Sequence, residues 1–120
     1  MTYKLEFKES ALKEWKKLGH TVKTQFKKKL KERLENPRIP SAALSGAKNI
    51  YKIKLRQLGY RLVYSVEDET ITVTVITVGK RDRNEIYAIA LSRMHDKSLV
   101  IATELTNDSP ETSFEANGYA

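Results

Sequence analysis

The chain has 120 residues, no cysteine and a formal net charge of +7. This length fits one small domain with a single hydrophobic core, and the lack of cysteine excludes disulfides and thiolate metal sites. The N-terminal residues are too polar for a signal peptide and no stretch is apolar enough to span a membrane, so we expect a cytoplasmic protein that does not bind membranes.

Positive charge is concentrated in the first 94 residues. They hold 21 lysine and arginine residues against 10 aspartate and glutamate residues, a net of +11, whereas residues 95–120 hold 1 against 5, a net of −4. We therefore divide the chain into a basic domain, residues 1–94, and an acidic C-terminal extension, residues 95–120, whose polar composition predicts disorder. A basic domain suits a polyanionic partner such as nucleic acid, although a merely solvated basic surface fits the composition too.

The N-terminal part of the chain predicts a strand and then a helix. Residues 2–8 alternate apolar and polar side chains, as a strand with one buried face does. The helix begins at residue 9 or 10 and ends at Gly19, a residue type that commonly follows a helix. Trp15 falls on its apolar stripe, so we expect this side chain in the core rather than in a binding site.

A second helix, from residue 20 or 21 to Asn36, carries many lysines. Its buried stripe recurs at four-residue intervals: Val22, Phe26, Leu30 and Leu34. Basic residues cover much of the remaining surface: Lys23, Lys27, Lys28, Lys29, Lys31 and Arg33. Such a run is usually a solvated helix face, and the functional alternative is a surface that tracks phosphates and adds salt-dependent affinity. Residues 37–49, which contain two prolines, predict a loop.

Residues 51–64, YKIKLRQLGYRLVY, predict a β-hairpin with one apolar and one cationic face. Apolar residues alternate with lysine and arginine along the first strand. A four-residue loop, 56–59, ends in a glycine that tolerates positive φ and sets Lys54 opposite Arg61. A shorter loop would split the core. The favoured register gathers Lys52, Lys54 and Arg61, and since like charges across a ladder cost stability, this surface is a candidate anion site.

A β-branched run at residues 71–78 predicts a third strand, suited to the centre of a sheet. A turn at residues 67–70 sets Val66 opposite Ile71, which places alternate valines in the core. Beyond the domain, residues 98–105 are compatible with a short strand or a helix.

A final helix is predicted within residues 79–94. Val63 and Ile76 form a small apolar seat on the outer face of the sheet, and we expect the helix to lie there. In that position it brings Arg81 and Tyr87 toward the cations of the hairpin.

This combination of cations and a tyrosine permits RNA cleavage without a metal or cofactor. Such cleavage needs a base for the 2′-hydroxyl, positive charge to stabilise the phosphorane and a proton for the leaving 5′-oxygen. Neighbouring cations lower the pKa of a lysine or a tyrosine, so either type would serve as the base. No phosphate-binding glycine loop or metal-ligand pattern occurs, and His20 and His95 lie outside the predicted cluster. A non-catalytic RNA-binding face fits the same residues.

The stretches ALKEWKKLG, YKIKLR, GYRLVY and VGKRDRNEIY together make residues 2–93 resemble the RelE toxins of bacterial toxin–antitoxin pairs. The resemblance implies an α+β domain of the RelE/ParE class, ordered β-α-α-β-β-β-α, with an antiparallel sheet packed on two N-terminal helices and a C-terminal helix. It also implies an endoribonuclease that cuts mRNA in the A site of the 70S ribosome without metal. A RelB-like antitoxin would wrap the toxin, displace its last helix and bind operator DNA only as the complex.

The resemblance also assigns roles to residues. Lys52 and Lys54 match active-site lysines of the family, with Lys54 a proton-transfer group. Arg61 matches the arginine that holds the scissile phosphate, and Arg81 the one that stabilises the transition state or the leaving group. Tyr87 matches the tyrosine that stacks on the codon and activates the 2′-hydroxyl. Further cations are expected to bind RNA or the ribosome: Lys23, Lys27, Lys28, Lys31, Lys48, Arg56, Lys80 and Arg83.

Two departures from the family pattern keep other functions open. Ser45 stands where close members carry an arginine, although Lys48 lies near enough to compensate, and the acidic extension is not part of the pattern. One alternative is an inactive relative that only binds antitoxin. Another is a gyrase inhibitor with the same fold, against which the retained cations argue. The extension is either a disordered segment without a role or a shield over the cationic face.

Overall fold

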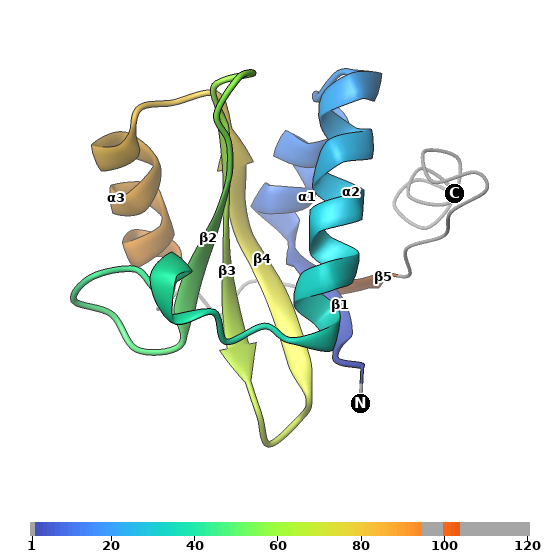
Figure 1. The fold of residues 1–120 in the computed structure, drawn as a ribbon, viewed down its shortest axis with the longest axis vertical. Helices are drawn as coiled ribbons and strands as arrows, with labels where there is room; N and C mark the ends of the chain where they lie inside the picture. Colours follow the sequence, from blue (N-terminus) through green and yellow to red (C-terminus); the bar gives the residue numbers. More distant parts are fainter. Residues whose placement is uncertain (1, 95–99, 104–120) are drawn as a thin grey trace.

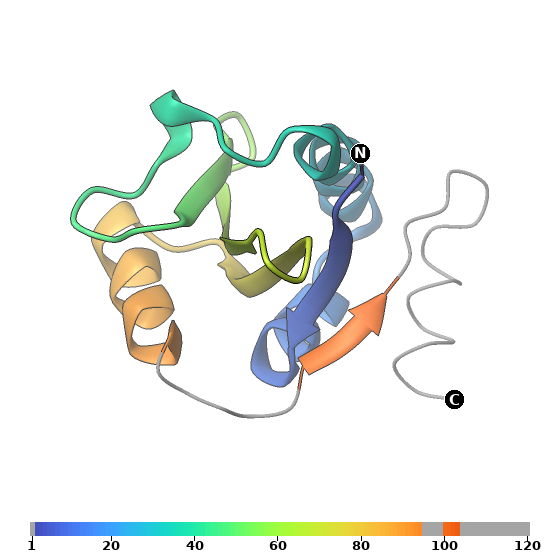
Figure 2. The same cartoon turned by 90° about the horizontal axis from the view of Figure 1, so that it is seen from below.

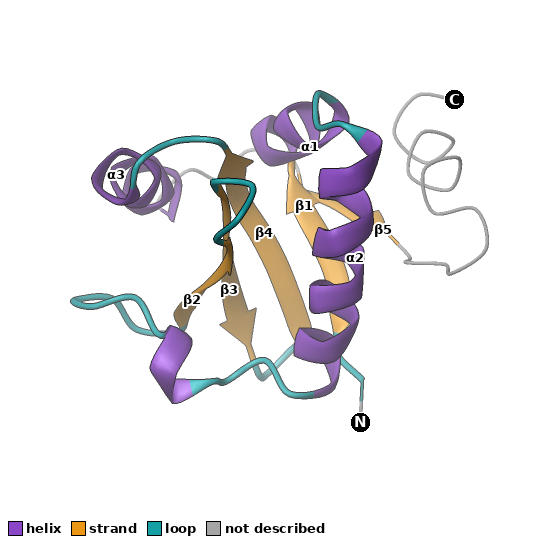
Figure 3. Ribbon diagram, turned by 45° about the horizontal axis from the view of Figure 1, so that its top comes forward, coloured by secondary structure: helices purple, strands orange, loops and turns teal. Residues whose placement is uncertain are grey.

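A mixed five-stranded sheet carries helices on both of its faces (Figure 1). The computed structural model describes residues 2–94 and 100–103. In chain order the elements are β1 (Lys4–Lys8), α1 (Glu9–Lys16), α2 (His20–Glu35), the short 3-10 helix η1 (Pro40–Ala42), β2 (Ile50–Leu55), β3 (Tyr60–Glu67), β4 (Thr72–Gly79), α3 (Arg83–Met94) and β5 (Val100–Thr103). Helices α1 and α2 cover one face of the sheet and α3 the other (Figure 3), which confirms the predicted α+β class.

The main core lies between the sheet and the two N-terminal helices. Trp15 is fully buried there, with its ring 5.4 Å from that of Phe7 in an edge-to-face arrangement and 6.3 Å from that of Phe26. Aromatic pairs at these separations add stability beyond the area they bury. The prediction that Trp15 is a core residue is therefore confirmed.

Helix α2 buries a wider face than its sequence pattern predicts. The expected stripe is buried, but Lys23 and Lys27 are buried with it, each about 5% exposed. Each follows a stripe residue directly in sequence, so a face only slightly wider than one row includes both. The expectation that these two lysines lie on a solvated surface is wrong.

The β2–β3 hairpin has the register that its hydrophobic pattern predicts. Lys54 lies opposite Arg61 and Leu55 opposite Tyr60. Gly59 has φ +76°, in the left-handed region, and its N–H donates to the carbonyl of Leu55 over 2.8 Å. The turn therefore needs glycine at this position, because an L side chain is strained there.

The β3–β4 connection is longer than expected. Val66 pairs with Val73 and not with Ile71, because Ile71 belongs to the turn, where it has φ +54° and its N–H donates to Asp68 O. A shift of two residues leaves the same side chains on each face. The pairing slips by one residue between Val63 and Tyr64, a β-bulge of the kind that re-aims side chains.

The sheet is not wholly antiparallel. Strand β1 pairs in parallel with β4, Leu5 opposite Val73, because the two helices carry the chain across to the far edge of the sheet before the β2–β3–β4 meander returns it. On its other side β1 pairs antiparallel with β5, which confirms the strand alternative for residues 98–105 and shows order in part of the extension that we expected to be disordered. Figure 2 shows β5 beside β1, at the edge opposite β2. Residues 104–120 and His95 lie outside the described residues.

Helix α3 lies where the apolar seat predicts. Its buried residues Ile86 and Ala90 pack against Val63 and Ile76 on the outer face of the sheet, together with Leu44 and Ile50. This contact fixes the start of α3 beside the hairpin. Within the described part of the chain, none of the helices has the length and apolarity needed to cross a membrane.

Candidate active site: a cationic cluster between the hairpin and α3

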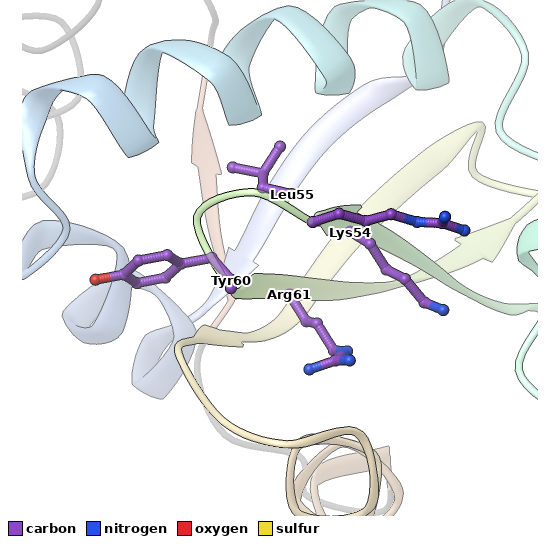
Figure 4. Close-up of a pocket in the computed structure, with 6 residues that line it drawn as sticks. Lys54, Leu55, Tyr60 and Arg61 are labelled. Atoms are coloured by element: carbon purple, nitrogen blue, oxygen red, sulfur yellow. The ribbon is translucent and has the colours of Figure 1, made fainter.

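Two neighbouring strands supply the centre of the cationic cluster, which consists of Lys52, Lys54, Arg56, Arg61 and Arg83 with Tyr87 beside them. Lys54 on β2 and Arg61 on β3 are direct partners in the ladder, and their side chains extend to the same side of the hairpin, whereas Leu55 and Tyr60 turn away from them (Figure 4). The hairpin is hollowed here by a volume of about 250 Å³. The residues that line it are Lys54, Leu55, Arg56, Gly59, Tyr60 and Arg61.

The surroundings of Lys54 disfavour its protonated form. Partial desolvation lowers the pKa of its ammonium group, and neighbouring positive charge lowers it further. Four cations contribute: Lys52, Arg56, Arg61 and Arg83. This confirms that the cluster lowers a lysine pKa, which is the direction that favours proton transfer by a lysine.

Arg61 ties β3 to the segment that precedes α3. Its Nη1 donates to the backbone carbonyl of Arg81 over 2.8 Å, which holds that segment against the hairpin. Its Nε is buried and has no hydrogen-bond partner among the described residues. A buried N–H without a partner is costly, so this group gains stability from any acceptor that reaches it.

Tyr87 lies on the face of α3 that meets the cluster, and its environment differs from the prediction. Burial raises the pKa of its phenol, and the charges of Arg61 and Arg83 offset this only in part. We expected the neighbouring cations to lower this pKa. That expectation is wrong, because the ring packs against the apolar cluster beneath α3 that contains Ile86 and Ala90, and this burial disfavours the charged phenolate. The hydroxyl is buried, and although Arg61 is nearby, no partner among the described residues has hydrogen-bond geometry.

Arg81 reaches the cluster with its backbone and not with its guanidinium group. Its Nη1 pairs with Glu85 Oε1 at 3.1 Å, one helical turn along the chain. Both side chains are about half exposed, so this pair is weak and readily exchanged for another anion. Glu85 was not predicted from the sequence, although its four-residue spacing from Arg81 indicates an ion pair along a helix.

The start of α3 is fixed by a side-chain cap. Asp82 Oδ1 accepts from the N–H of Glu85 over 2.9 Å, which satisfies one of the free amides of the first turn. The cap sets the orientation of the turn that carries Arg83, whose charge reaches both Lys54 and Tyr87. Lys52 completes the cluster from the other side, with its Nζ 3.5 Å from the carbonyl of Ala43.

The residues expected to bind RNA or the ribosome do not form one surface. Lys28 and Lys31 are exposed on α2, on the opposite side of the sheet from α3, while Lys23 and Lys27 are buried. The remaining four are exposed: Lys48, Arg56, Lys80 and Arg83. Arg56 and Arg83 act on Lys54 directly, and the Lys80 ammonium lies 5.9 Å from the centre of the Tyr60 ring.

Ser45 lies on the loop that joins η1 to β2. The residue before it, Leu44, is buried in the apolar cluster beneath α3, and the loop is exposed from Ser45 to Gly46. The Leu44 N–H donates to the carbonyl of Ile50 over 2.8 Å, which closes the base of this loop. Ser45 and Lys48 therefore project from a loop that is anchored on the α3 side of the sheet.

Among residues 2–94 and 100–103, no group of three or more histidine, cysteine, aspartate or glutamate side chains is placed to hold a metal ion. The cluster itself consists of cations and a phenol. It can bind an anion and, through Lys54, exchange a proton.

Known proteins share both the sequence and the fold of this chain. Residues 5–85 match the family model of the ParE toxin of type II toxin–antitoxin system parDE. The mRNA interferase toxin RelE of Escherichia coli K12 is 58% identical over 94 residues, which cover 78% of this chain and 99% of that protein. A putative RelE-like toxin protein of E. coli is 53% identical over the same shares.

Solved structures agree with this relationship. The free R81A/R83A variant of E. coli RelE has a TM-score of 0.73 and 56% identity, and the match covers 78% of this chain and 99% of that one. A chain of the intact E. coli RelBE toxin–antitoxin complex has a TM-score of 0.65 and 60% identity, covering 68% and 99%. The chain therefore belongs to the RelE family of toxins of type II toxin–antitoxin systems, within the RelE/ParE superfamily.

Proposed function

We propose that this chain is a ribosome-dependent endoribonuclease, an mRNA interferase, which stops translation by cutting mRNA in the ribosomal A site. The observation that carries the proposal is the convergence of Lys54 and Arg61 from the hairpin with Arg83 and Tyr87 from α3 on one side of the sheet. The concentration of positive charge suits a phosphodiester whose charge grows in the transition state. The relative with 58% identity is named an mRNA interferase toxin.

The chemistry begins with the removal of a proton from a 2′-hydroxyl. Lys54 is the better candidate for this base, because its pKa is lowered whereas that of Tyr87 is raised. The 2′-oxygen attacks the adjacent phosphorus, and the bond from phosphorus to the 5′-oxygen breaks. The leaving oxygen takes up a proton, and the products are a 2′,3′-cyclic phosphate and a 5′-hydroxyl.

The arginines stabilise the charge that develops on the phosphorane. Arg61 offers its unpaired Nε, while Nη1 stays on the Arg81 carbonyl. Arg81 contributes its guanidinium group after it exchanges Glu85 for the phosphate, which costs little because the pair is exposed. Tyr87 presents an aromatic ring for a codon base to stack on, a contact worth about 1–3 kcal/mol per base.

The mechanism uses no metal ion within the protein. A divalent cation placed among Lys52, Lys54 and Arg61 would be repelled by each of them, and the same three charges already supply the stabilisation that a metal would bring. Ribosomal RNA then has to hold the 2′-hydroxyl in line with the leaving oxygen, because the cluster contains no strong base of its own.

The proposed partners follow from the same surface. They are the A site of the 70S ribosome with its mRNA, a RelB-like antitoxin, and operator DNA bound only by the toxin–antitoxin complex in the cytoplasm. An E. coli relative has been solved in complex with a peptide of the antitoxin RelB, at 54% identity to this chain. An acidic or amphipathic antitoxin segment would complement the net charge of +11 on residues 1–94.

The test compares purified ribosomes carrying an A-site mRNA with the same mRNA alone. The proposal expects cleavage within the A-site codon on ribosomes and little cleavage of free mRNA at equal toxin concentration. Rapid cleavage of free mRNA would contradict ribosome dependence. Because the matching family model is that of ParE toxins, a gyrase supercoiling assay runs in parallel, and inhibition there without mRNA cleavage would replace the proposal with the gyrase alternative.

A further inference from the structure

The C-terminal end of α3 is clamped to α1 by an ion pair. Arg93 Nη1 lies 2.9 Å from Glu14 Oε1, and its Nη2 donates to Oε2 over 3.2 Å, so the guanidinium group binds the carboxylate with two hydrogen bonds. Nη1 also donates to the backbone carbonyl of Ile76 over 3.0 Å. Both side chains are only 21% exposed, which distinguishes this pair from the solvent-exposed ion pairs elsewhere in the molecule.

The Glu14 carboxylate also holds the sheet. Its Oε1 accepts from Thr77 Oγ1 over 2.9 Å and from the N–H of Val78 over 3.2 Å. One carboxylate on α1 is therefore bonded both to β4 and to the last turn of α3. The carbonyl that Arg93 binds belongs to Ile76, the β4 residue that the bulge leaves unpaired in the ladder with β3.

The remaining attachment of α3 is modest. Of its 12 residues, only Ile86 and Ala90 are buried. Tyr87 adds a partly buried ring to this apolar contact, and Ala90 offers only a small side chain to it. At the other end, the segment before the helix is held by the bond from Arg61 to the Arg81 carbonyl. The clamp at Arg93 is thus a substantial part of what sets the position of the helix.

We propose that Arg93 is a positioning residue of the active site: by binding Glu14 and the Ile76 carbonyl, it fixes α3 so that Tyr87 and Arg83 face Lys54 and Arg61. Arg93 follows Tyr87 by six residues, about 9 Å along the helix axis, and it touches none of the cluster residues. It acts only through the placement of α3. The inference rests on the proposed nuclease function.

Displacement of α3 would matter more for the reaction than for folding. A misplacement of about 1 Å in a catalytic group can cost about 100-fold in rate. The rest of the fold keeps its core when the clamp is lost, because the main core lies on the other face of the sheet. The clamp is therefore expected to affect the cleavage step and not the binding of the ribosome.

The test uses four variants of the full chain. Arg93→Gln removes the clamp, and Glu14→Gln removes its charge while keeping an acceptor for Thr77 and Val78. The double variant measures their coupling, and Arg93→Lys restores the charge with a single bond to the carboxylate. The control is Ser92→Ala, which changes the adjacent residue of α3, whose hydroxyl bonds only to Ile89 O in its own helix.

Three quantities are measured: the single-turnover rate of A-site cleavage at saturating ribosome, the affinity for the ribosome, and the hydrogen exchange of α3 amides. We expect Arg93→Gln to lower the rate at least tenfold, with affinity changed less than threefold and faster exchange confined to α3. The double variant should be no worse than the more impaired single variant, Arg93→Lys should recover part of the rate, and Ser92→Ala should match the wild type.

A wild-type rate and unchanged α3 exchange in Arg93→Gln would overturn the inference, as would losses that multiply in the double variant. A wild-type protein that fails to cleave contradicts the proposed function instead. In that case the exchange data decide alone: faster exchange in α3 supports the clamp, and unchanged exchange refutes it.

Discussion

Lys54 and Arg61 occupy directly opposed positions in the β2–β3 ladder, so the hairpin places two positive charges side by side on one face. Opposed like charges destabilise an antiparallel pair. The chain accepts this cost at the one place where α3 brings further cations, and the pKa of the Lys54 ammonium falls in response. The paired charges therefore lower the stability of the fold and favour the function of the site.

Replacement of Lys54 by glutamine should stabilise the fold while impairing cleavage. Removal of one of two opposed charges relieves about 0.2–1 kcal/mol of repulsion, and the neutral side chain still fits a partly exposed strand position. Urea denaturation at neutral pH measures the effect on the free energy of unfolding. Lys52→Gln, which removes a cation without changing a directly opposed pair, is the matched control. A less stable Lys54→Gln protein would contradict the interpretation.

The same stability difference should depend on pH. Because the pKa of Lys54 is lowered in the folded state, the unfolded chain binds more protons between that pKa and the ordinary lysine value of 10.5. The destabilisation by Lys54 is fully present at lower pH and fades as the pH rises through the folded-state pKa. The difference in the free energy of unfolding between the wild type and Lys54→Gln should therefore become smaller when urea denaturation is measured at alkaline pH. A gap that stays constant up to pH 10.5 would show that the pKa is not lowered.

Cleavage should rise with pH as Lys54 loses its proton. The midpoint should lie below the ordinary lysine value, and Lys54→Arg should lower the single-turnover rate by about 100-fold or more, because arginine keeps the charge but does not act as a base. Ribosome affinity should change little in this variant. A Lys54→Arg enzyme with the wild-type rate and pH profile would remove Lys54 from the mechanism.

Tyr87 should act through its ring and not through its hydroxyl. Its raised pKa keeps the phenol protonated near neutral pH, and its buried hydroxyl lacks a partner among the described residues. Tyr87→Phe should therefore lose less than tenfold in cleavage rate and be at least as stable as the wild type, whereas Tyr87→Ala should lose much more. Equal losses in the two variants would assign the role to the hydroxyl group.

Glu85 should restrain Arg81. Because the carboxylate competes with RNA for the guanidinium group, Glu85→Gln should raise RNA cleavage or affinity by up to about fivefold, the equivalent of an exposed ion pair. Arg81→Ala should act in the opposite direction. Asp68→Asn is the control, because it weakens the exposed ion pair with Arg38, away from the cluster. A Glu85→Gln variant that is slower than the wild type would give Glu85 a direct role in the reaction.

Truncation after Met94 should affect stability and not cleavage. The described part of the extension is β5, which pairs with β1 and is separated from the cationic strand β2 by three other strands. Loss of β5 removes several backbone hydrogen bonds, so we expect the free energy of unfolding to fall by about 1–3 kcal/mol. The alternative hypothesis, that the extension shields the cationic face, predicts tighter ribosome binding by the truncated protein. A tighter complex would support shielding and contradict the expectation that the extension acts on stability alone.

Local patterns were sufficient to predict most of the fold. The alternation in YKIKLRQLGYRLVY fixed the register that opposes Lys54 to Arg61, because any one-residue slip would expose the core. The seat of α3 followed from Val63 and Ile76. The parallel pairing of β1 with β4 did not follow, because it depends on where two helices return the chain, and a strand carries no signal of its neighbour's direction.

The residue types of the site were predictable from the sequence, but the balance between burial and neighbouring charge at each residue was not. Charge patterns identified the cations, while the pKa of Tyr87 depended on how deeply α3 buries the ring, which no sequence spacing reveals. Two lysines of α2 were misplaced because the buried face of that helix exceeds its apolar stripe. The clamp from Arg93 to Glu14 joins residues 79 positions apart and has no local signature.

Attack by the 2′-hydroxyl is tested by single-turnover cleavage of an A-site mRNA on purified ribosomes, with a ribose or a 2′-deoxyribose at the scissile nucleotide. If the cationic cluster promotes attack by the 2′-hydroxyl, the ribose substrate is cut to a 2′,3′-cyclic phosphate and a 5′-hydroxyl end, and the deoxyribose substrate remains intact. Equal cleavage of both substrates, or no cleavage of the ribose substrate while the protein remains bound to the ribosome, would contradict it.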